Sequence, residues 1–336
     1  MTAPFDIQAA ADWVERLQTP DGAIPWIKTG IWDPWCHTES ALGLLAAGRT
    51  EAALRAFDYL VLTQEEDGGW THDLGAAAPM DATQRRLLPD APRLRETNFA
   101  AWTAVGVWGL GLAVGEDALR RFGPMALRAC DFALSLQKPE GEIAWAAGSD
   151  EALYAANCAI FKSLSCAARI ASALGTSCDP YSHGRAALRR ALAKPANRFT
   201  PKPTHAMDWY YPVLAGVLTG PAGQGRLRSR WEKFVKDGEG CRCVSDQPWV
   251  TGAETSELAI ACLMVGWRED AETLLACAAR MQDATGGMWM GRQFAQHVWW
   301  PLERPSWTAG AALMAADALY GLSPASALFT KESAEP

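Results

Sequence analysis

A short turn recurs four times along this chain, and it constrains the fold more than any other feature of the sequence. Each copy has a Gln, three further residues and a Gly, with a Trp two to four residues later. Each Gln closes an amphipathic segment, so the unit is typical of a helix with a Gly C-cap and an aromatic that packs back on it. Such repetition indicates an array of supersecondary units, although four unrelated helix ends would also produce it. The copies are Gln18 with Gly22 and Trp26, Gln64 with Gly68 and Trp70, Gln137 with Gly141 and Trp145, and Gln282 with Gly286 and Trp289.

Six segments between these units are apolar nearly all round, which is typical of helices buried on every side. They cover residues 37–48, 96–112, 153–175, 207–220, 254–266 and 306–322. They alternate with six more polar helical segments that begin near residues 6, 51, 118, 184, 224 and 269. Six buried helices enclosed by six amphipathic ones predict an all-α fold, an (α/α)6 toroid of outer-inner hairpins with a central cavity.

The same pattern predicts the domain organisation. Residues 1–325 are expected to form a single domain, and residues 326–336 a disordered tail, because the closing TKESAEP has no apolar anchor. Strand signals are nearly absent, since no segment sustains an alternation of period two. We therefore expect no sheet of three or more strands.

Composition and charge exclude several classes of protein. A net charge of −7 without a basic cluster argues against a nucleic-acid partner, because phosphate binding needs a positive stripe. No signal peptide and no apolar run of about 18 residues is present, so we expect a cytoplasmic protein without a membrane span. The nine cysteines show no zinc spacing and the glycines no dinucleotide loop, so neither metal nor cofactor is expected. The expected partner is a small-molecule substrate.

The second copy of the turn resembles a known motif. Tyr59, Leu60, Gln64, Gly68 and Trp70 are similar to the QW repeat of squalene and terpenoid cyclases. Those cyclases and the related protein prenyltransferases are built on an α/α toroid, so the resemblance implies the same architecture. It also implies an isoprenoid substrate as one alternative, although the chain has no Asp-x-Asp-Asp run, the motif that holds the cyclase proton donor.

The first turns of the inner helices should share the face that opens into the cavity, and they gather carboxylates, histidines and aromatics. Acidic residues at helix starts also suit the helix dipole and capping, which is the alternative for Glu96, Asp150 and Glu254. The candidate substrate-binding residues are Trp35, His37, Glu39, Glu96, Asp150, Tyr154, Trp209, Tyr210, Glu254, Trp300, Glu303 and Trp307.

Two carboxylates stand out as catalytic candidates. Asp208 lies among aromatic residues, which should raise the pKa of its carboxyl through desolvation. Glu257, on the next inner helix, should project toward the cavity wall and act as its partner. His205 and His297 are the reserve candidates for proton transfer.

The composition of these turns bears on function. Sugar rings stack on Trp while their hydroxyls bind carboxylates, and a pair of carboxyl groups cleaves glycosidic bonds. Alternatively, aromatic faces would stabilise a carbocation during an isoprenoid cyclisation, or the toroid would be a non-catalytic module that binds sugar or lipid. Because every first turn brings a carboxylate, the sequence favours an acid-base enzyme acting on a polar, sugar-containing substrate, with glycosidase-like or epimerase-like chemistry.

Overall fold

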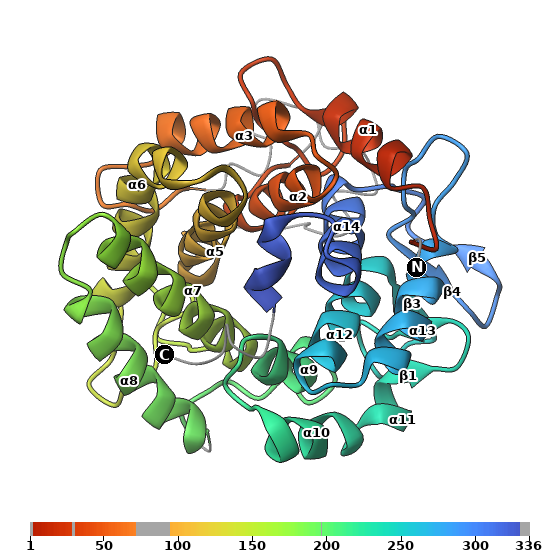
Figure 1. Cartoon of the computed structure of the whole chain (residues 1–336). Helices are drawn as coiled ribbons and strands as arrows, with labels where there is room; N and C mark the ends of the chain where they lie inside the picture. Colours follow the sequence, from red (N-terminus) through yellow and green to blue (C-terminus); the bar gives the residue numbers. More distant parts are fainter. Residues whose placement is uncertain (1–2, 29–30, 72–94, 196, 330–336) are drawn as a thin grey trace.

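The computed structural model describes residues 3–28, 31–71, 95–195 and 197–329, and it forms a closed ring of two concentric helical layers (Figure 1). The outer helices are amphipathic and bury one face against the inner layer. They are α1 (Ile7–Leu17), α3 (Thr50–Thr63), α6 (Glu116–Ser135), α8 (Asp179–Ala193), α10 (Gly220–Arg228) with the short α11 (Trp231–Phe234), and α13 (Arg268–Ala279).

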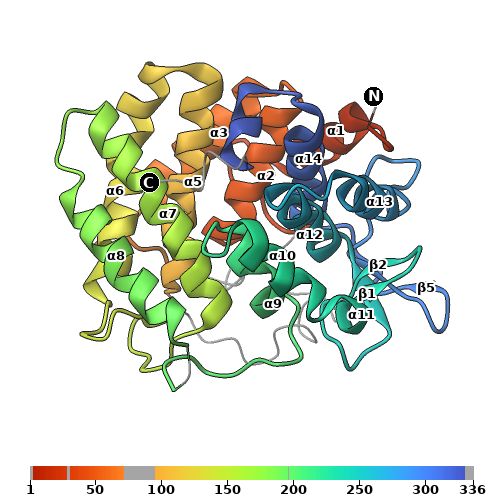
Figure 2. The same cartoon turned by 60° about the horizontal axis from the view of Figure 1, so that its bottom comes forward.

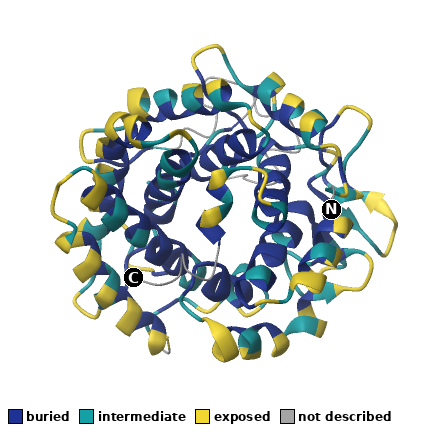
Figure 3. Cartoon of the chain, viewed as in Figure 1, coloured by how far each residue is buried: buried dark blue, intermediate teal, exposed yellow. Residues whose placement is uncertain are grey.

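The inner helices are buried almost all round, as their uninterrupted apolar composition predicts (Figure 3). Every residue of α2 except Cys36 is buried, for example. The inner helices are α2 (Pro34–Ala46), α5 (Thr97–Val114), α7 (Tyr154–Ala173), α9 (Met207–Leu214), α12 (Gly252–Met264) and α14 (Ser306–Tyr320). Alternation of the two layers along the chain confirms the predicted (α/α)6 toroid.

Helix α5 is long and apolar enough to cross a membrane by length and composition alone. However, 61 % of that helix is buried inside the protein. Its apolar surface is therefore used for packing within the ring.

The repeated Gln forms a clasp between neighbouring outer helices. Gln64 ends α3, and its Nε2 donates both to the Gly68 carbonyl and to the Met125 carbonyl of α6, each at 2.9 Å. The other three copies bond in the same way, once within their own turn and once to the next outer segment. The second acceptors are the carbonyls of Ala52 for Gln18 (2.9 Å), Gly184 for Gln137 (3.0 Å) and Asp6 for Gln282 (2.8 Å).

The Gly of each clasp allows the two outer helices to approach closely. Gly68 has φ +92°, and a Cβ there would lie 2.1 Å from the Arg128 carbonyl oxygen of α6. The three other copies show the same contact. A Cβ at each of their glycines would lie 2.1 to 2.4 Å from a backbone carbonyl oxygen of the next outer helix. Only Gly fits this site, both because of its φ and because no side chain has room.

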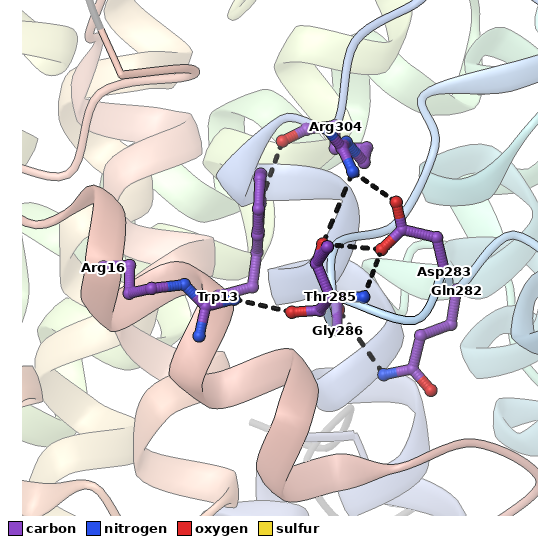
Figure 4. Close-up of polar contacts among 7 residues, drawn as sticks. All are labelled: Trp13, Arg16, Gln282, Asp283, Thr285, Gly286 and Arg304. Carbon is purple, nitrogen blue, oxygen red and sulfur yellow. Dashed lines mark hydrogen bonds and ion pairs between the residues drawn. The ribbon is translucent and has the colours of Figure 1, made fainter.

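The last clasp closes the ring by joining α13 to the start of the chain (Figure 4). Gln282 exchanges two hydrogen bonds with the Asp6 backbone, at 2.8 and 2.9 Å. Beside it, Arg304 forms an ion pair with Asp283, and Trp13 donates its indole N–H to the Arg304 carbonyl at 3.0 Å. Segments almost 300 residues apart are thereby held together.

Short strands lie at the periphery of the ring, and the expectation that no sheet has three or more strands is wrong. β1 (Val235–Lys236) pairs with β2 (Gly240–Cys241), whereas β3 (Trp249–Thr251), β4 (Gly291–Gln293) and β5 (Val298–Trp299) form a three-stranded antiparallel sheet. The sequence predicted no sheet of this size. Strands of two or three residues are too short to show an alternating pattern, which is why they left no signal.

The chain end also differs from expectation. Residues Pro324–Phe329, mostly expected to be a disordered tail, form the short helix η1 inside the ring (blue in Figures 1 and 2). Leu328 packs against Gly109 in the second half of α5, and the buried Lys162 donates to the Leu328 carbonyl at 2.7 Å. Two buried apolar side chains, Leu328 and Phe329, supply the anchor that the closing seven residues lack. Residues 330–336 lie outside the described part of the chain.

Substitution of Gly68 tests the close approach at the clasp. We expect Gly68→Ala to lower the free energy of unfolding by more than Gly48→Ala does. Both residues have positive φ, +92° and +78°, but a Cβ at Gly48 would meet nothing within 4 Å. The control therefore reports backbone strain alone, about 1 to 2 kcal/mol. Urea denaturation of both variants measures the difference, and equal losses would contradict the contact.

The hydrogen bonds of the clasp are tested separately by Gln64→Ala. Loss of the side-chain amide should lower stability by about 1 kcal/mol and leave activity per folded molecule unchanged. Gln296→Ala, at an exposed position, serves as the control. A loss of activity without a loss of stability would show that Gln64 acts in the site rather than in the fold.

Candidate active site

The inner helices place their first turns at one end of the ring, and those of α2, α9 and α12 meet there. α2 begins at Pro34 because Asp33 caps it, accepting from the Cys36 N–H at 2.8 Å, while Pro at the first position has no N–H to satisfy. α9 supplies two phenols and α12 supplies two carboxyl groups to the same place. We call Asp33, Glu39, Glu254 and Glu257 the carboxylate cluster.

Glu257 of α12 lies at the centre of this cluster, with only 5 % of its surface exposed. The Tyr211 hydroxyl donates to its Oε1 at 2.8 Å, and the Tyr210 hydroxyl donates to its Oε2. Burial raises the pKa of Glu257 to about 7, against the hydrogen bonds that favour its charged form. Such a carboxyl group exchanges its proton near neutral pH.

Glu39 of α2 lies close enough to Glu257 for each carboxyl group to influence the pKa of the other. Burial raises the pKa of Glu39 well above its usual range, and the negative charges of Glu257 and Asp33 raise it further. Two adjacent buried carboxyl groups cannot both ionise cheaply, which favours the protonated form of one of them. Helix α14 fixes the position of Glu39, because Gly310 of α14 packs against the Glu39 backbone. A Cβ at Gly310 would lie 2.9 Å from the Glu39 carbonyl oxygen.

Asp33 is the third buried carboxylate of the cluster, and the sequence did not single it out. Its Oδ2 accepts from the Trp26 indole N–H at 2.6 Å and its Oδ1 from the Cys36 N–H at 2.8 Å. The charge of Asp33 raises the pKa values of Glu39 and Glu96, so all three share one electrostatic environment. Its only sequence signal was an Asp before a Pro, which also marks an ordinary helix cap.

Aromatic rings surround the cluster. Trp35 stacks on Trp102 of α5, with ring centroids 4.4 Å apart, and its ring lies 5.8 Å from that of Tyr211. Trp26 meets Trp307 of α14 edge to face at 6.1 Å. Trp35 and Trp307 were expected at the site, whereas Trp102 and Tyr211 were missed because both read equally well as core residues.

Several buried polar atoms in these first turns have no hydrogen-bond partner among the described residues. They include Glu39 Oε1, Asn98 Oδ1, Trp102 Nε1 and Trp307 Nε1. Buried polar atoms are nearly always paired in folded proteins, so a group of unpaired ones needs an explanation. A ligand with several hydroxyl groups would satisfy both the donors and the acceptors.

Glu254 belongs to the cluster, and Glu96 borders it. Burial raises the pKa of Glu96 to about 8, and the charge of Asp33 adds to that rise. Glu254 accepts a hydrogen bond from the Thr251 hydroxyl, and its charge raises the pKa of Glu39. Five of the residues predicted from the sequence thus lie in or beside the cluster, and each carries a carboxyl or a phenol group. They are Glu39, Glu96, Tyr210, Glu254 and Glu257.

Asp208 is not brought to the cluster, so its expected pairing with Glu257 is wrong. Successive helical residues point about 100° apart, and Tyr210 and Tyr211 of α9 face Glu257 while Asp208 faces α7. There its Oδ1 accepts from the Ala155 N–H at 3.2 Å. Burial does raise the pKa of Asp208, as expected. The residue lines a separate pocket with Tyr154.

None of the three expected histidines joins the cluster. His37 is fully buried, with the Ile24 N–H donating to its Nδ1 at 3.1 Å and its Nε2 lying 2.9 Å from the Ala56 carbonyl. Burial lowers its pKa to about 4, so it is a neutral ring that joins α2 to the outer layer. His205 is exposed beside Thr204, and His297 is exposed at the β4–β5 turn beside Arg292.

The remaining expected residues lie at the edge of the site or in the wall of the ring. Asp150 is exposed. Trp209 is buried and donates to the Arg226 carbonyl at 2.8 Å, and Trp300 packs edge to face on Trp249 at 5.0 Å. Glu303 is buried beside the pocket between α1 and the start of α14. In the described ranges, no group of three His, Cys, Asp or Glu side chains is arranged to hold a metal ion.

The chain is similar to a characterised enzyme over nearly its whole length. It is 36 % identical over 334 residues to the MMP endo-(1,4)-3-O-methyl-α-D-mannosidase of Mycolicibacterium hassiacum. The match covers 97 % of this chain and 89 % of that enzyme. No protein-family model matches the chain.

Solved structures share the fold at low sequence identity. A structure described as a wild-type glycosidase has a TM-score of 0.72 at 16 % identity, covering 94 % of this chain and 96 % of that one. The GH63 mannosylglycerate hydrolase from Thermus thermophilus, in complex with Tris and D-glycerate, has a TM-score of 0.71 at 12 % identity, covering 92 % and 99 %. These likenesses establish the α/α toroid, but they are to glycosidases and do not support the expected resemblance to terpenoid cyclases in particular.

The raised pKa of Glu96 predicts how stability depends on pH. The folded state keeps the proton up to a pH of about 8, whereas an unfolded Glu loses it near 4.5. The folded state therefore binds more protons in this window, and its stability falls as pH rises from about 4.5 to about 8. Glu96→Gln should make the fall less steep, while Glu66→Gln, at an exposed position, should not. Urea denaturation between pH 5 and pH 8 measures both slopes, and parallel curves for Glu96→Gln and wild type would contradict the assignment.

Proposed function

Because the chain belongs to the family of the MMP endo-(1,4)-3-O-methyl-α-D-mannosidase, we propose that it cleaves α-mannosidic bonds within an oligosaccharide or polysaccharide. It is a glycoside hydrolase that acts on a sugar substrate through carboxylate chemistry. The mannose-containing substrate, the internal cleavage and the residue roles that follow are our proposal.

We assign the role of general acid to Glu257. A general acid is most effective when its pKa lies near the working pH, and burial raises that of Glu257 to about 7. In the protonated state, Glu257 gives its proton to the oxygen of the leaving sugar as the glycosidic bond breaks. Tyr211, at 2.8 Å, then stabilises the carboxylate that remains, and Glu39 lies within hydrogen-bond reach to return a proton.

The second catalytic carboxylate must stand apart from the acid. The two carboxyl groups of a glycosidase flank the bond and are about 5 to 9.5 Å apart. Glu39 and Glu257 are adjacent carboxyl groups that influence each other's pKa, so we do not assign Glu39 to the opposite side of the bond. We assign this role to Asp33, because Trp26 and Cys36 hold both of its oxygens as acceptors in a fixed orientation. Asp33 would take the proton of an attacking water or attack the sugar carbon itself.

The surroundings of the cluster suit a sugar. Trp35 and Trp102 present flat apolar faces, and Asn98 and Trp307 supply an unpaired acceptor and an unpaired donor. Pyranose rings combine apolar faces with hydroxyl groups in the same way. An isoprenoid has no hydroxyl groups to satisfy those atoms, so we do not propose the cyclase alternative. A cytoplasmic location stays a prediction.

Two substitutions test the roles. Glu257→Gln and Asp33→Asn should each lower kcat on an α-(1,4)-linked mannoside by about 100-fold or more, the scale of positioned acid-base catalysis. Hydrolysis is followed as release of reducing ends, with circular dichroism to verify folding. Asp270→Asn, at an exposed position on α13, is the control. A folded Glu257→Gln variant with wild-type kcat would refute the acid assignment.

The pH profile gives an independent test of the same acid. Glu257 acts as a donor only while it is protonated, so activity should fall as pH rises above about 7. Glu257→Gln should lose this alkaline limb together with most of the activity. If the residual activity of the variant still falls above the same pH as the wild type, another group donates the proton.

A further inference from the structure

A second pocket lies beside the carboxylate cluster, between the loop that leads into α9 and the starts of α7 and α9. Its volume is about 360 Å³, within the range of small-molecule sites. Nothing in the proposed catalytic chemistry uses it. Its lining residues are Tyr154, Pro195, Asn197, Phe199, Thr200, Pro201, Lys202, Pro203, Asp208, Arg226 and Arg230.

One side of this pocket is apolar. Phe199 and Tyr154 pack edge to face, with ring centroids 5.3 Å apart, and Phe199 keeps only 8 % of its surface exposed. Three prolines of the same loop, Pro195, Pro201 and Pro203, continue the wall. Proline fixes its own backbone φ, so the loop presents a wall that is largely preformed.

The opposite side is polar and held in place by hydrogen bonds. Asp208 accepts from the Ala155 N–H at 3.2 Å, which orients its carboxyl group. Arg226 donates to the Asp208 carbonyl at 2.6 Å and to the Trp209 carbonyl at 3.1 Å. A carboxyl group beside guanidinium groups provides acceptors and donors within one pocket.

Charges connect this pocket to the carboxylate cluster. Lys202 lies at its rim and acts electrostatically on both Asp208 and Glu96. Glu96 in turn lies within reach of the charge of Asp33. The pocket therefore lies toward the side of the cluster that Glu96 borders.

We propose that this pocket binds a 3-O-methylated mannose unit of the substrate, remote from the bond that is cleaved. The inference rests on the proposed function. A methyl ether turns one hydroxyl of a sugar into an apolar group, so the unit needs an apolar wall for the methyl and polar partners for the other hydroxyls. Phe199 and the prolines provide the wall, and Asp208 and Arg226 provide the partners.

The test compares α-(1,4)-linked mannotetraose with and without 3-O-methyl groups. Wild-type enzyme should have a kcat/KM higher by about fourfold for each methyl group held in the pocket, the value of burying one such group. Phe199→Ala should reduce this preference toward unity, because the methyl group loses the wall that it packs on. Phe294→Ala, an aromatic of the β4–β5 hairpin, should keep the preference. Equal effects of Phe199→Ala on both substrates would overturn the proposal.

Asp208→Asn provides a second measurement that does not depend on the apolar wall. A carboxyl group that holds a remote sugar should raise KM for both chains and leave kcat within about twofold, because the interaction is equal in ground and transition states. A loss of kcat of about 100-fold would instead place Asp208 at the reacting bond and overturn the subsite.

A binding experiment separates failure of this inference from failure of the proposed function. The same two tetrasaccharides are titrated into Glu257→Gln protein by calorimetry, with and without Phe199→Ala. One outcome is that the methylated chain binds selectively, that this selectivity depends on Phe199, and that the protein with Glu257 intact cleaves neither chain. This outcome would support the pocket and refute the proposed function. Cleavage without any methyl preference would retain the function and refute the pocket.

Discussion

The clasp between neighbouring outer helices is the contact on which the whole ring depends. A Gln side chain bonds the backbone of the next outer segment, and a Gly without a side chain lets that backbone approach. Since Gln282 makes the same contact with Asp6, the array cannot open into a superhelix. Inner helices with no polar face of their own are then enclosed on every side, and their first turns are forced to meet.

Enclosure also creates the chemistry of the cluster. Carboxyl groups that would be charged in water are buried together, which favours their protonated forms. Tyr210 and Tyr211 oppose this by donating to Glu257, and the balance leaves its pKa at about 7. Glu39 receives no such pair of phenols among the described residues, and burial with the charges of Glu257 and Asp33 raises its pKa well above its usual range. The hydroxyls of α9 thus favour the charged form of Glu257 and have no counterpart at Glu39.

Periodicity and the repeated turn were sufficient to predict the layers and the hairpins, because each depends on residues near in sequence. The choice among acidic residues failed where direction around a helix mattered. Asp208 and Tyr210 lie two positions apart on α9, yet one faces the pocket near Ala155 and the other faces Glu257. Asp33 was missed for a related reason, since its role as a helix cap and its place in the cluster produce the same sequence signal. The short strands and η1 depend on tertiary contacts alone, which no local pattern reports.

The position of η1 limits how a polymer can reach the cluster. This segment packs inside the ring against the second half of α5, and Lys162 of α7 donates to its Leu328 carbonyl. The chain's own C-terminal segment therefore occupies space inside the ring, away from the first turns that hold the carboxylates. A glycan that reaches the carboxylate cluster would then enter and leave on the side of those first turns, and each new cut of a long polymer would need a new approach from that side.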